Sequence, residues 1–135
     1  ESHQKSLYHA GTVMACNYLV SLLEASRETF ALAGIDTQTS NAIMAPLVKQ
    51  TAENLLGKPM GNKQIEGKPA ASILTGPIAR GDHAVVAQQL KSLQSADPEL
   101  AELYRCLGRK TLQIARDKAT AELKHLDTLD DLFNA

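Results

Sequence analysis

The sequence is poor in aromatic residues and has no long hydrophobic run. Its 135 residues include no Trp, and aromatic residues make up only 4%, which leaves little material for the aromatic platforms that stack nucleobases. The formal net charge of -1 provides no electrostatic attraction to nucleic acid or to an anionic membrane surface. No stretch of about 18 consecutive apolar residues occurs, so we expect no transmembrane helix. The sequence therefore predicts neither a nucleic-acid nor a membrane partner.

Cysteines and metal-binding motifs are also scarce. Cys16 and Cys106 are the only cysteines and lie far apart in helical patterns, which is typical of buried thiols in a reducing compartment and not of a disulfide framework. No basic-then-apolar signal peptide opens the chain, so we expect a cytoplasmic location. The four histidines form no H-E-x-x-H motif and no pairing with cysteine at metal spacing. No metal site is predicted.

The common nucleotide-binding motifs are missing as well. Gly76 and Gly81 have the spacing of a P-loop, but Asp82 and His83 follow where Lys and Ser or Thr are required. A carboxylate at that position would repel a triphosphate. No G-x-G-x-x-G occurs, so the usual dinucleotide-binding fold is not expected in this chain.

Helical patterns dominate what is present. Residues 4–33 contain no proline and end before Gly34, so they predict one long helix with a glycine at its C-terminal end. Residues 7–23 are apolar nearly all round the helix, and such a segment is expected to be buried on most sides.

A second helix and a loop follow. Thr39 or Ser40 can cap a helix that reaches Leu56, which Pro46 either starts or kinks. Residues 57–69 hold three glycines and two prolines, and this composition predicts a loop.

Two further helices have clear starts. Asp82 stands at the N-cap position of one, and Asp97 followed by Pro98 starts the other. The second of these helices has an expected inner stripe, made of Leu100, Leu103, Leu107, Thr111 and Ile114. The acidic tail "LDTLDDLFNA", residues 126–135, is expected to add one last turn or two.

Strand patterns are almost absent. Only "AASILT" is a candidate strand, and it is short. The sequence therefore predicts one all-α domain over residues 1–135, a bundle of four or five helices of which two are long.

Three polar residues share one face of the first helix. At 100° per residue, His9, Cys16 and Asn17 project into the sector that later becomes the charged face of the same helix. Such a face can line a cleft, where His9 is the best-placed group to exchange a proton. The alternative is that His9 and Asn17 are polar groups satisfied within the core.

The stretch "LTGPIARGD", residues 74–82, concentrates turn-forming residues between two helical segments. Thr75, Gly76, Arg80 and Asp82 are its candidate binding residues. A guanidinium beside a helix N-terminus suits a carboxylate or a phosphate. Two structural alternatives remain open: Asp82 can act only as a helix cap, and Arg80 can form an ion pair, for example with Asp82.

Three stretches carry a family resemblance: "LYHAGTVMACNYLVSLL" (7–23), "LTGPIARGD" (74–82) and "LYRCLGRKTLQIA" (103–115). Together they resemble the helical C-terminal domain, known only as a domain of unknown function, that follows a Rossmann-like NADP-binding domain in predicted oxidoreductases. The resemblance implies an architecture similar to the C-terminal domains of 6-phosphogluconate dehydrogenase, ketopantoate reductase and pyrroline-5-carboxylate reductase. In those enzymes the helical domain closes over the nicotinamide, contacts the substrate and often forms the dimer.

The resemblance implies the substrate-binding and dimerisation part of an NAD(P)-dependent oxidoreductase. Arg80 would hold an anionic group of a small substrate, and His9 or Asn17 would lie near the reacting centre. NAD(P) would be bound mainly by an N-terminal domain that is missing here, so this chain alone is expected to bind no cofactor and to be inactive. Its first residue, Glu1, indicates a fragment.

Two expectations concern partners. The apolar circumference of residues 7–23 exceeds what four or five helices can readily cover, which predicts a homodimer. The rival interpretation is a non-enzymatic helical interaction module, in which residues 74–82 only brace two helices.

Overall fold

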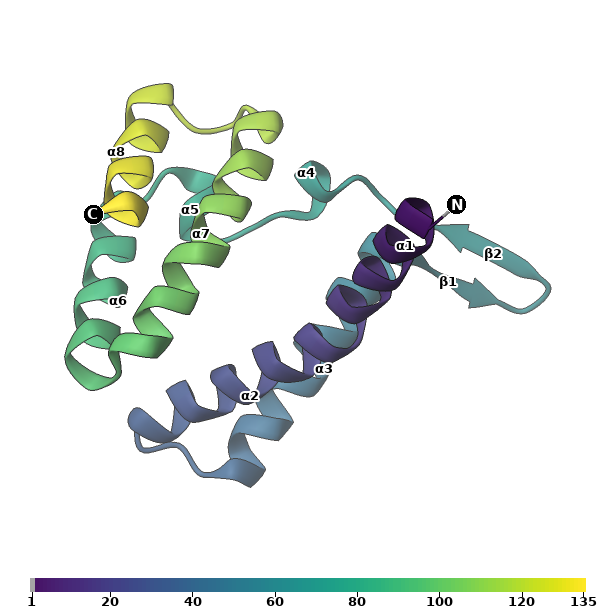
Figure 1. Cartoon of the computed structure of the whole chain (residues 1–135), viewed down its shortest axis with the longest axis horizontal. Helices are drawn as coiled ribbons and strands as arrows, with labels where there is room; N and C mark the ends of the chain where they lie inside the picture. The colour runs from purple at the N-terminus through teal and green to yellow at the C-terminus, as the bar shows by residue number, and fades with distance from the viewer. Residues whose placement is uncertain (1) are drawn as a thin grey trace. The chain divides into compact units, whose positions relative to one another are not determined.

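The structure is a computed structural model that describes residues 2–135, and the chain is mostly helical, as predicted (Figure 1). It divides into two compact units, with the boundary between Ile43 and Met44 inside one helix. Within the described residues, six helices have 12 residues or more and two have a single turn. The expected number of four or five was therefore too low.

The first unit begins with two helices where one was predicted. Helix α1 covers Ser2–Ala15 and helix α2 covers Asn17–Leu32. Cys16 lies between them with φ −115° and ψ −67°, although its amide still donates to Thr12 O at 3.0 Å. No proline or glycine marks this residue, so the sequence carries no signal for the break.

The predicted helix end at Gly34 is confirmed. Gly34 has φ +79°, its amide donates to Ala31 O, and the amide of Ile35 donates to Phe30 O. These two bonds form the Schellman motif, in which a glycine adopts a left-handed conformation that other residues resist.

Helix α3 covers Thr37–Leu56 and runs through Pro46. Its cap is Asp36, not Thr39 or Ser40 as predicted. Asp36 Oδ1 accepts from the amide of Thr39 at 2.9 Å, and Asp36 Oδ2 accepts from Thr39 Oγ1 at 2.7 Å. Because these bonds favour the ionised carboxylate, they lower the pKa of Asp36 below its usual value. Because the helix begins at Thr37, Asp36 holds the N-cap position, and Thr39 and Ser40 lie inside the helix.

The expected burial of residues 7–23 is not found in the single chain. No residue of Ser2–Ala15 or Asn17–Leu32 is buried. Tyr8 is 70% exposed and Val20 is 66% exposed. A helix with apolar groups all round needs neighbours on several sides, and this unit alone does not supply them.

In the second unit, α3 is followed by a hairpin where a loop was predicted (Figure 1). Strands β1 (Gly57–Met60) and β2 (Lys63–Glu66) pair antiparallel, with Met60 opposite Lys63. Gly61, with φ +59°, and the following Asn form the two-residue turn. A Gly-Asn pair between extended residues is a hairpin signal that was missed.

The segment predicted as the only candidate strand is helical. "AASI" forms the one-turn helix α4, Ala70–Ile73. It is followed by the one-turn helix α5, Pro77–Arg80. A run of six residues is too short for its pattern to separate a strand from a helix.

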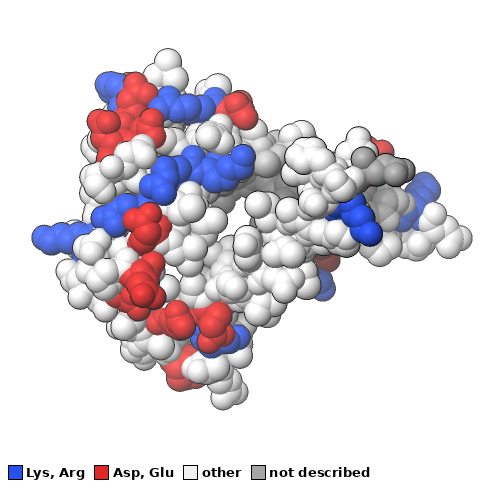
Figure 2. All heavy atoms as spheres, in the orientation of Figure 1, with Lys and Arg blue, Asp and Glu red and all other residues white. Residues whose placement is uncertain are grey.

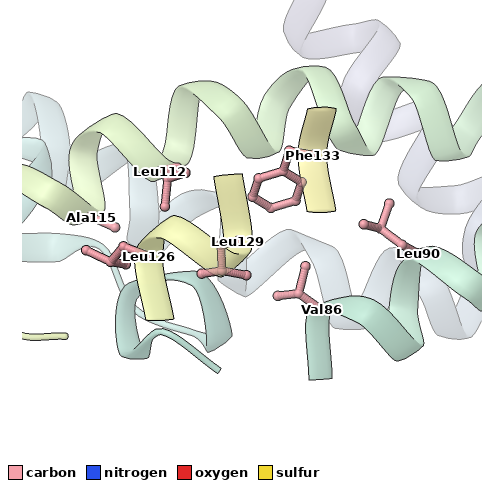
Figure 3. Packing of buried hydrophobic residues seen from close by; sticks show 7 residues of the cluster. All are labelled: Val86, Leu90, Leu112, Ala115, Leu126, Leu129 and Phe133. Atoms are coloured by element: carbon pink, nitrogen blue, oxygen red, sulfur yellow. The ribbon is translucent and has the colours of Figure 1, made fainter. Parts of the chain in front are cut away.

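The core of the second unit lies between three longer helices. Helix α6 covers His83–Ala96, α7 covers Pro98–Lys118 and α8 covers Leu123–Asn134. Figure 3 shows side chains from α6 and α7 pointing toward those of α8, and the buried cluster consists of Val86, Leu90, Leu112, Ala115, Leu126, Leu129 and Phe133. The acidic tail, expected to add a turn or two, is therefore a core helix.

Helix α7 starts as predicted, but of the predicted inner stripe only Leu100 is buried. Asp97 Oδ1 accepts from the amides of Glu99 and Leu100 at 2.9 and 3.2 Å, which confirms the cap. Leu103 and Leu107 of the predicted stripe are exposed. The buried residues are Leu100, Ala101, Gly108, Leu112 and Ala115.

Small residues explain this change of face. A Cβ at Gly108 would overlap the ring of Phe133. Ala101, Gly108 and Ala115 thus form the side on which large residues of a neighbouring helix can approach closely, and the long apolar side chains of α7 remain on another side.

Candidate functional site

Residues 74–82 form a one-turn helix held between two glycines. Gly76 precedes α5 with φ +94°, and Gly81 follows it with φ +69°. The amide of Arg80 donates to Gly76 O at 3.2 Å, and the amide of Asp82 donates to Pro77 O at 2.8 Å. These bonds fix the direction in which the backbone presents residue 80.

Gly81 is needed for a second reason. A Cβ there would lie 2.9 Å from His125 Cβ and 3.1 Å from Ala121 Cβ. Thr120 Oγ1 also donates to Ala79 O at 3.4 Å. The start of α8 and the segment before it therefore pack directly on the end of α5.

A shallow pocket opens at this junction. Its volume is about 320 Å³, and it is lined by Arg80, Gly81, Asp82, His83, Ala84 and His125. The rings of His83 and His125 have centroids 5.4 Å apart, with an angle of 56° between their planes. The volume is at the lower end of the range for small-molecule sites, about 300–1,000 Å³.

The two structural alternatives for this stretch have different outcomes. Asp82 Oδ1 accepts from the amide of Val85 at 3.3 Å, so Asp82 caps α6. Arg80 is exposed, and no ion pair within residues 2–135 includes it. The cap accounts for Asp82, whereas an ion pair does not account for Arg80.

The other candidates in this stretch are placed as follows. Thr75 is exposed between α4 and α5, and Gly76 is half-buried at the start of α5. Neither lines the pocket. Their predicted binding roles remain predictions.

His9 and Asn17 belong to the first unit. Both are exposed, and the ring of His9 meets that of Tyr8 edge-on at a centroid distance of 5.6 Å. His9 lies in α1 and Asn17 is the first residue of α2, on either side of the break at Cys16. Their predicted catalytic roles stay predictions.

Sequence reasoning missed the two histidines of the pocket. His83 directly follows Asp82, so its place beside the cap was available from the sequence. His125 lies 43 residues after Asp82, directly before the segment that was read as a tail, and only the packing of α8 on Gly81 brings it here. In the part of the chain that the structure describes, no group of three or more His, Cys, Asp or Glu residues is arranged to hold a metal ion.

Comparison with known proteins places the chain in a family. Residues 1–111 match the domain of unknown function DUF2520, and the chain therefore belongs to that family. The match includes residues 74–84 but ends before α8, so His125 lies outside it. No curated protein and no solved structure matches the chain. Among the helices described, none combines the length and the apolar character needed to cross a membrane.

Proposed function

Because the chain is a DUF2520 domain, and because its three characteristic stretches resemble the helical domain that follows a Rossmann-like domain, we propose that it is the substrate-binding and dimerisation part of an NAD(P)-dependent oxidoreductase. Its fold would be similar to the 6-phosphogluconate dehydrogenase C-terminal domain. NAD(P) would be held mainly by the Rossmann-like domain, and the enzyme would work in the cytoplasm.

The observation that carries this proposal is the exposed and unpaired guanidinium of Arg80 among the described residues. It is an exposed arginine at the edge of a pocket, without an ion pair among the described residues. Its backbone is held between Gly76 and Gly81, so the guanidinium starts from a defined position. A guanidinium in a defined position can form two parallel hydrogen bonds with a planar anion, which a lysine cannot do. An anionic group of a small substrate is the ligand that fits.

The chemistry of hydride transfer also needs a proton carrier. The oxygen or nitrogen that is reduced or oxidised must gain or lose a proton, and a histidine suits this task near neutral pH. His9 is the proposed proton carrier, and Asn17 is proposed to orient the reacting group. Both are exposed in the first unit and free to meet a substrate.

The proposed homodimer rests on the surface of α1 and α2. Residues 6–23 contain no Asp, Glu, Lys or Arg. Their large apolar side chains are exposed, among them Leu7, Tyr8, Met14, Tyr18, Leu19 and Val20. Figure 2 shows few charged side chains over α1 and many over α6–α8. Exposed apolar surface of this extent marks an interface in soluble proteins, and the commonest partner is a second copy.

The test uses the protein in its full natural length. Arg80→Lys should weaken binding of an anionic substrate or inhibitor by about 1.5–3 kcal/mol, the range for a hydrogen bond to a charged group. Calorimetric titration with NADP⁺ and a panel of small organic acids measures it. Arg27→Lys serves as the control and should leave affinity unchanged, because Arg27 is a half-buried arginine of the first unit that pairs with Glu24 and donates to Asn41. Equal affinities of wild type and Arg80→Lys for every acid would refute the proposal, and so would the absence of any NADP⁺-dependent oxidoreductase activity.

The same titration separates the rival function. A helical interaction module would bind neither dinucleotide nor acids, and Arg80→Lys would leave its behaviour unchanged. If the protein binds another protein but binds neither the dinucleotide nor the acids, that alternative is favoured.

A further inference from the structure

The pocket at the α5–α6 junction contains two imidazoles that the proposed function does not use. His83 comes from the first residue of α6, and His125 comes from α8. Their rings are 5.4 Å apart between centroids and tilted by 56°. Both side chains are half-buried and line the same pocket as Arg80. Three nitrogen-bearing side chains from three elements therefore meet at one opening.

The backbone of this segment has little left to offer a ligand. The amides of Arg80, Gly81, Asp82 and His83 donate to Gly76 O, Ile78 O, Pro77 O and Gly81 O respectively. The amide of Val85 donates to Asp82 Oδ1. Most of the amides along this stretch are therefore already engaged, and side chains are the main groups left to contact a ligand.

The charge of the pocket depends on the histidines. Arg80 and Asp82 contribute opposite fixed charges, and part of the Asp82 carboxylate is already engaged by the amide of Val85. Histidine is the side chain that ordinarily changes charge between pH 5 and 8. Each proton taken up by His83 or His125 adds one positive charge to a pocket whose other charges nearly cancel.

The ionisable groups that line the pocket are few. None besides Arg80, Asp82 and the two histidines lines the pocket, among the residues that the structure covers. On α8 and just before it, Lys124 and Glu122 form an exposed ion pair with Nζ–Oε2 at 2.8 Å. Because this pair is neutral as a whole, it does not decide the sign of the local potential.

We propose that Arg80, His83 and His125 form a binding site for the anionic group of a small molecule, and that its affinity rises when the histidines take up protons. This proposal depends on the proposed function only because both assign Arg80 to the binding of an anion. A tetrahedral oxyanion, with oxygens in several directions, is the group that can contact side chains from α5, α6 and α8 at once. The volume of about 320 Å³ leaves room for the rest of a small molecule.

Sulfate is the probe of choice because it remains a dianion over the whole pH range of the experiment. Its affinity for the full chain is measured by calorimetric titration at about pH 5.5 and about pH 8.5, on either side of the range in which histidine changes charge. The wild type should bind sulfate about tenfold more tightly at the lower pH, the effect of gaining one charge-assisted hydrogen bond. Acetate, measured in parallel, tests whether a planar carboxylate gains as much.

The variants separate the three side chains. His83→Gln and His125→Gln should each reduce the pH-dependent gain, and the double variant should abolish it. Arg80→Ala should lower sulfate affinity at both pH values. His3→Gln, which removes an exposed histidine of α1, is the matched control and should behave as the wild type does. Because His125 packs on Gly81, circular dichroism must show a folded His125→Gln protein, and His83→Gln carries the test if it does not.

The outcomes distinguish this site from the proposed function. The site is overturned if sulfate affinity does not change with pH. It is also overturned if the double histidine variant still binds sulfate more tightly at the lower pH. Either result leaves the role of Arg80 in substrate binding intact. If the pH-dependent gain disappears with the histidines but Arg80→Ala binds sulfate as tightly as the wild type at both pH values, Arg80 is not part of the site, and the central residue of the proposed function is lost with it.

Discussion

Helices α1 and α2 of the first unit and helix α8 of the second both carry large apolar residues, but they differ in where the charges stand. In α8, Leu126, Leu129 and Phe133 recur on one side and are fully buried, while its acidic residues occupy other sides. In residues 6–23 no charged side chain marks an outer face, and Leu19 and Val20 remain 42% and 66% exposed.

The difference shows what a single neighbour can cover. An amphipathic helix buries one stripe against one or two partners, as α8 does against α6 and α7. A helix with apolar groups on all sides exposes some of them until it is surrounded. The buried core cluster thus lies in the second unit, whereas helices α1 and α2 of the first unit contain no buried residue.

The largest effect is expected from removing the central core residue of the second unit. Phe133→Ala should lower the free energy of unfolding by about 3–5 kcal/mol, through lost apolar burial and a cavity beside Gly108. Tyr18→Ala, its counterpart on the exposed surface of α2, should leave the denaturation midpoint of the monomer nearly unchanged and weaken the dimer. Urea denaturation and light scattering at tens of micromolar measure the two effects. A strictly monomeric wild type would contradict the assignment of the first unit to an interface.

The next comparison uses one glycine from each unit. Gly34 and Gly81 both have positive φ, but nothing lies within 4 Å of a Cβ at Gly34, whereas one at Gly81 would press on His125 Cβ at 2.9 Å. Gly34→Ala should cost about 1–2 kcal/mol, the penalty for a left-handed L-residue. Gly81→Ala should cost more, because steric displacement of α8 adds to the same penalty. Equal thermal shifts in the two variants would mean that α8 does not pack as closely as described.

A smaller loss is expected at the start of α7. Asp97→Ala removes the acceptor of two amide hydrogen bonds, and this should cost about 1 kcal/mol. Asp97→Asn keeps an acceptor oxygen and should lose less. Chemical denaturation followed by circular dichroism compares the two, and an alanine variant as stable as the wild type would place the start of the helix elsewhere.

The smallest effect belongs to the first unit and depends on pH. Hydrogen bonds from Thr39 lower the pKa of Asp36 in the folded state. A lowered pKa means that the cap stabilises α3 at pH values above the usual Asp pKa, about 3.9. The stabilisation is lost as the pH falls through the lower, folded-state value. Thermal unfolding of wild type and Asp36→Asn between about pH 2 and 6 should therefore converge at the acidic end, and curves that stay parallel would argue against this cap.

The sequence by itself determined the features that depend on neighbouring residues. The mostly helical character, the caps at Asp82 and Asp97, and the glycine that ends α2 were all predictable, because capping and backbone freedom act within a few residues. The hairpin at residues 57–66 was also encoded locally, by the Gly-Asn pair, although that signal was overlooked. Cys16, in contrast, carries no local mark of the break between α1 and α2.

Only the tertiary structure decided which faces are buried and which side chains meet. The buried face of α7 includes Gly108 and Ala115 because the ring of Phe133, 25 residues after Gly108, requires space there. His125 joins Arg80 and His83 for the same reason: Gly81 lets α8 approach more closely than any residue with a side chain would allow. Periodicity identifies which residues are apolar along one helix, but the choice between two apolar faces depends on the shape of a neighbour distant in the sequence.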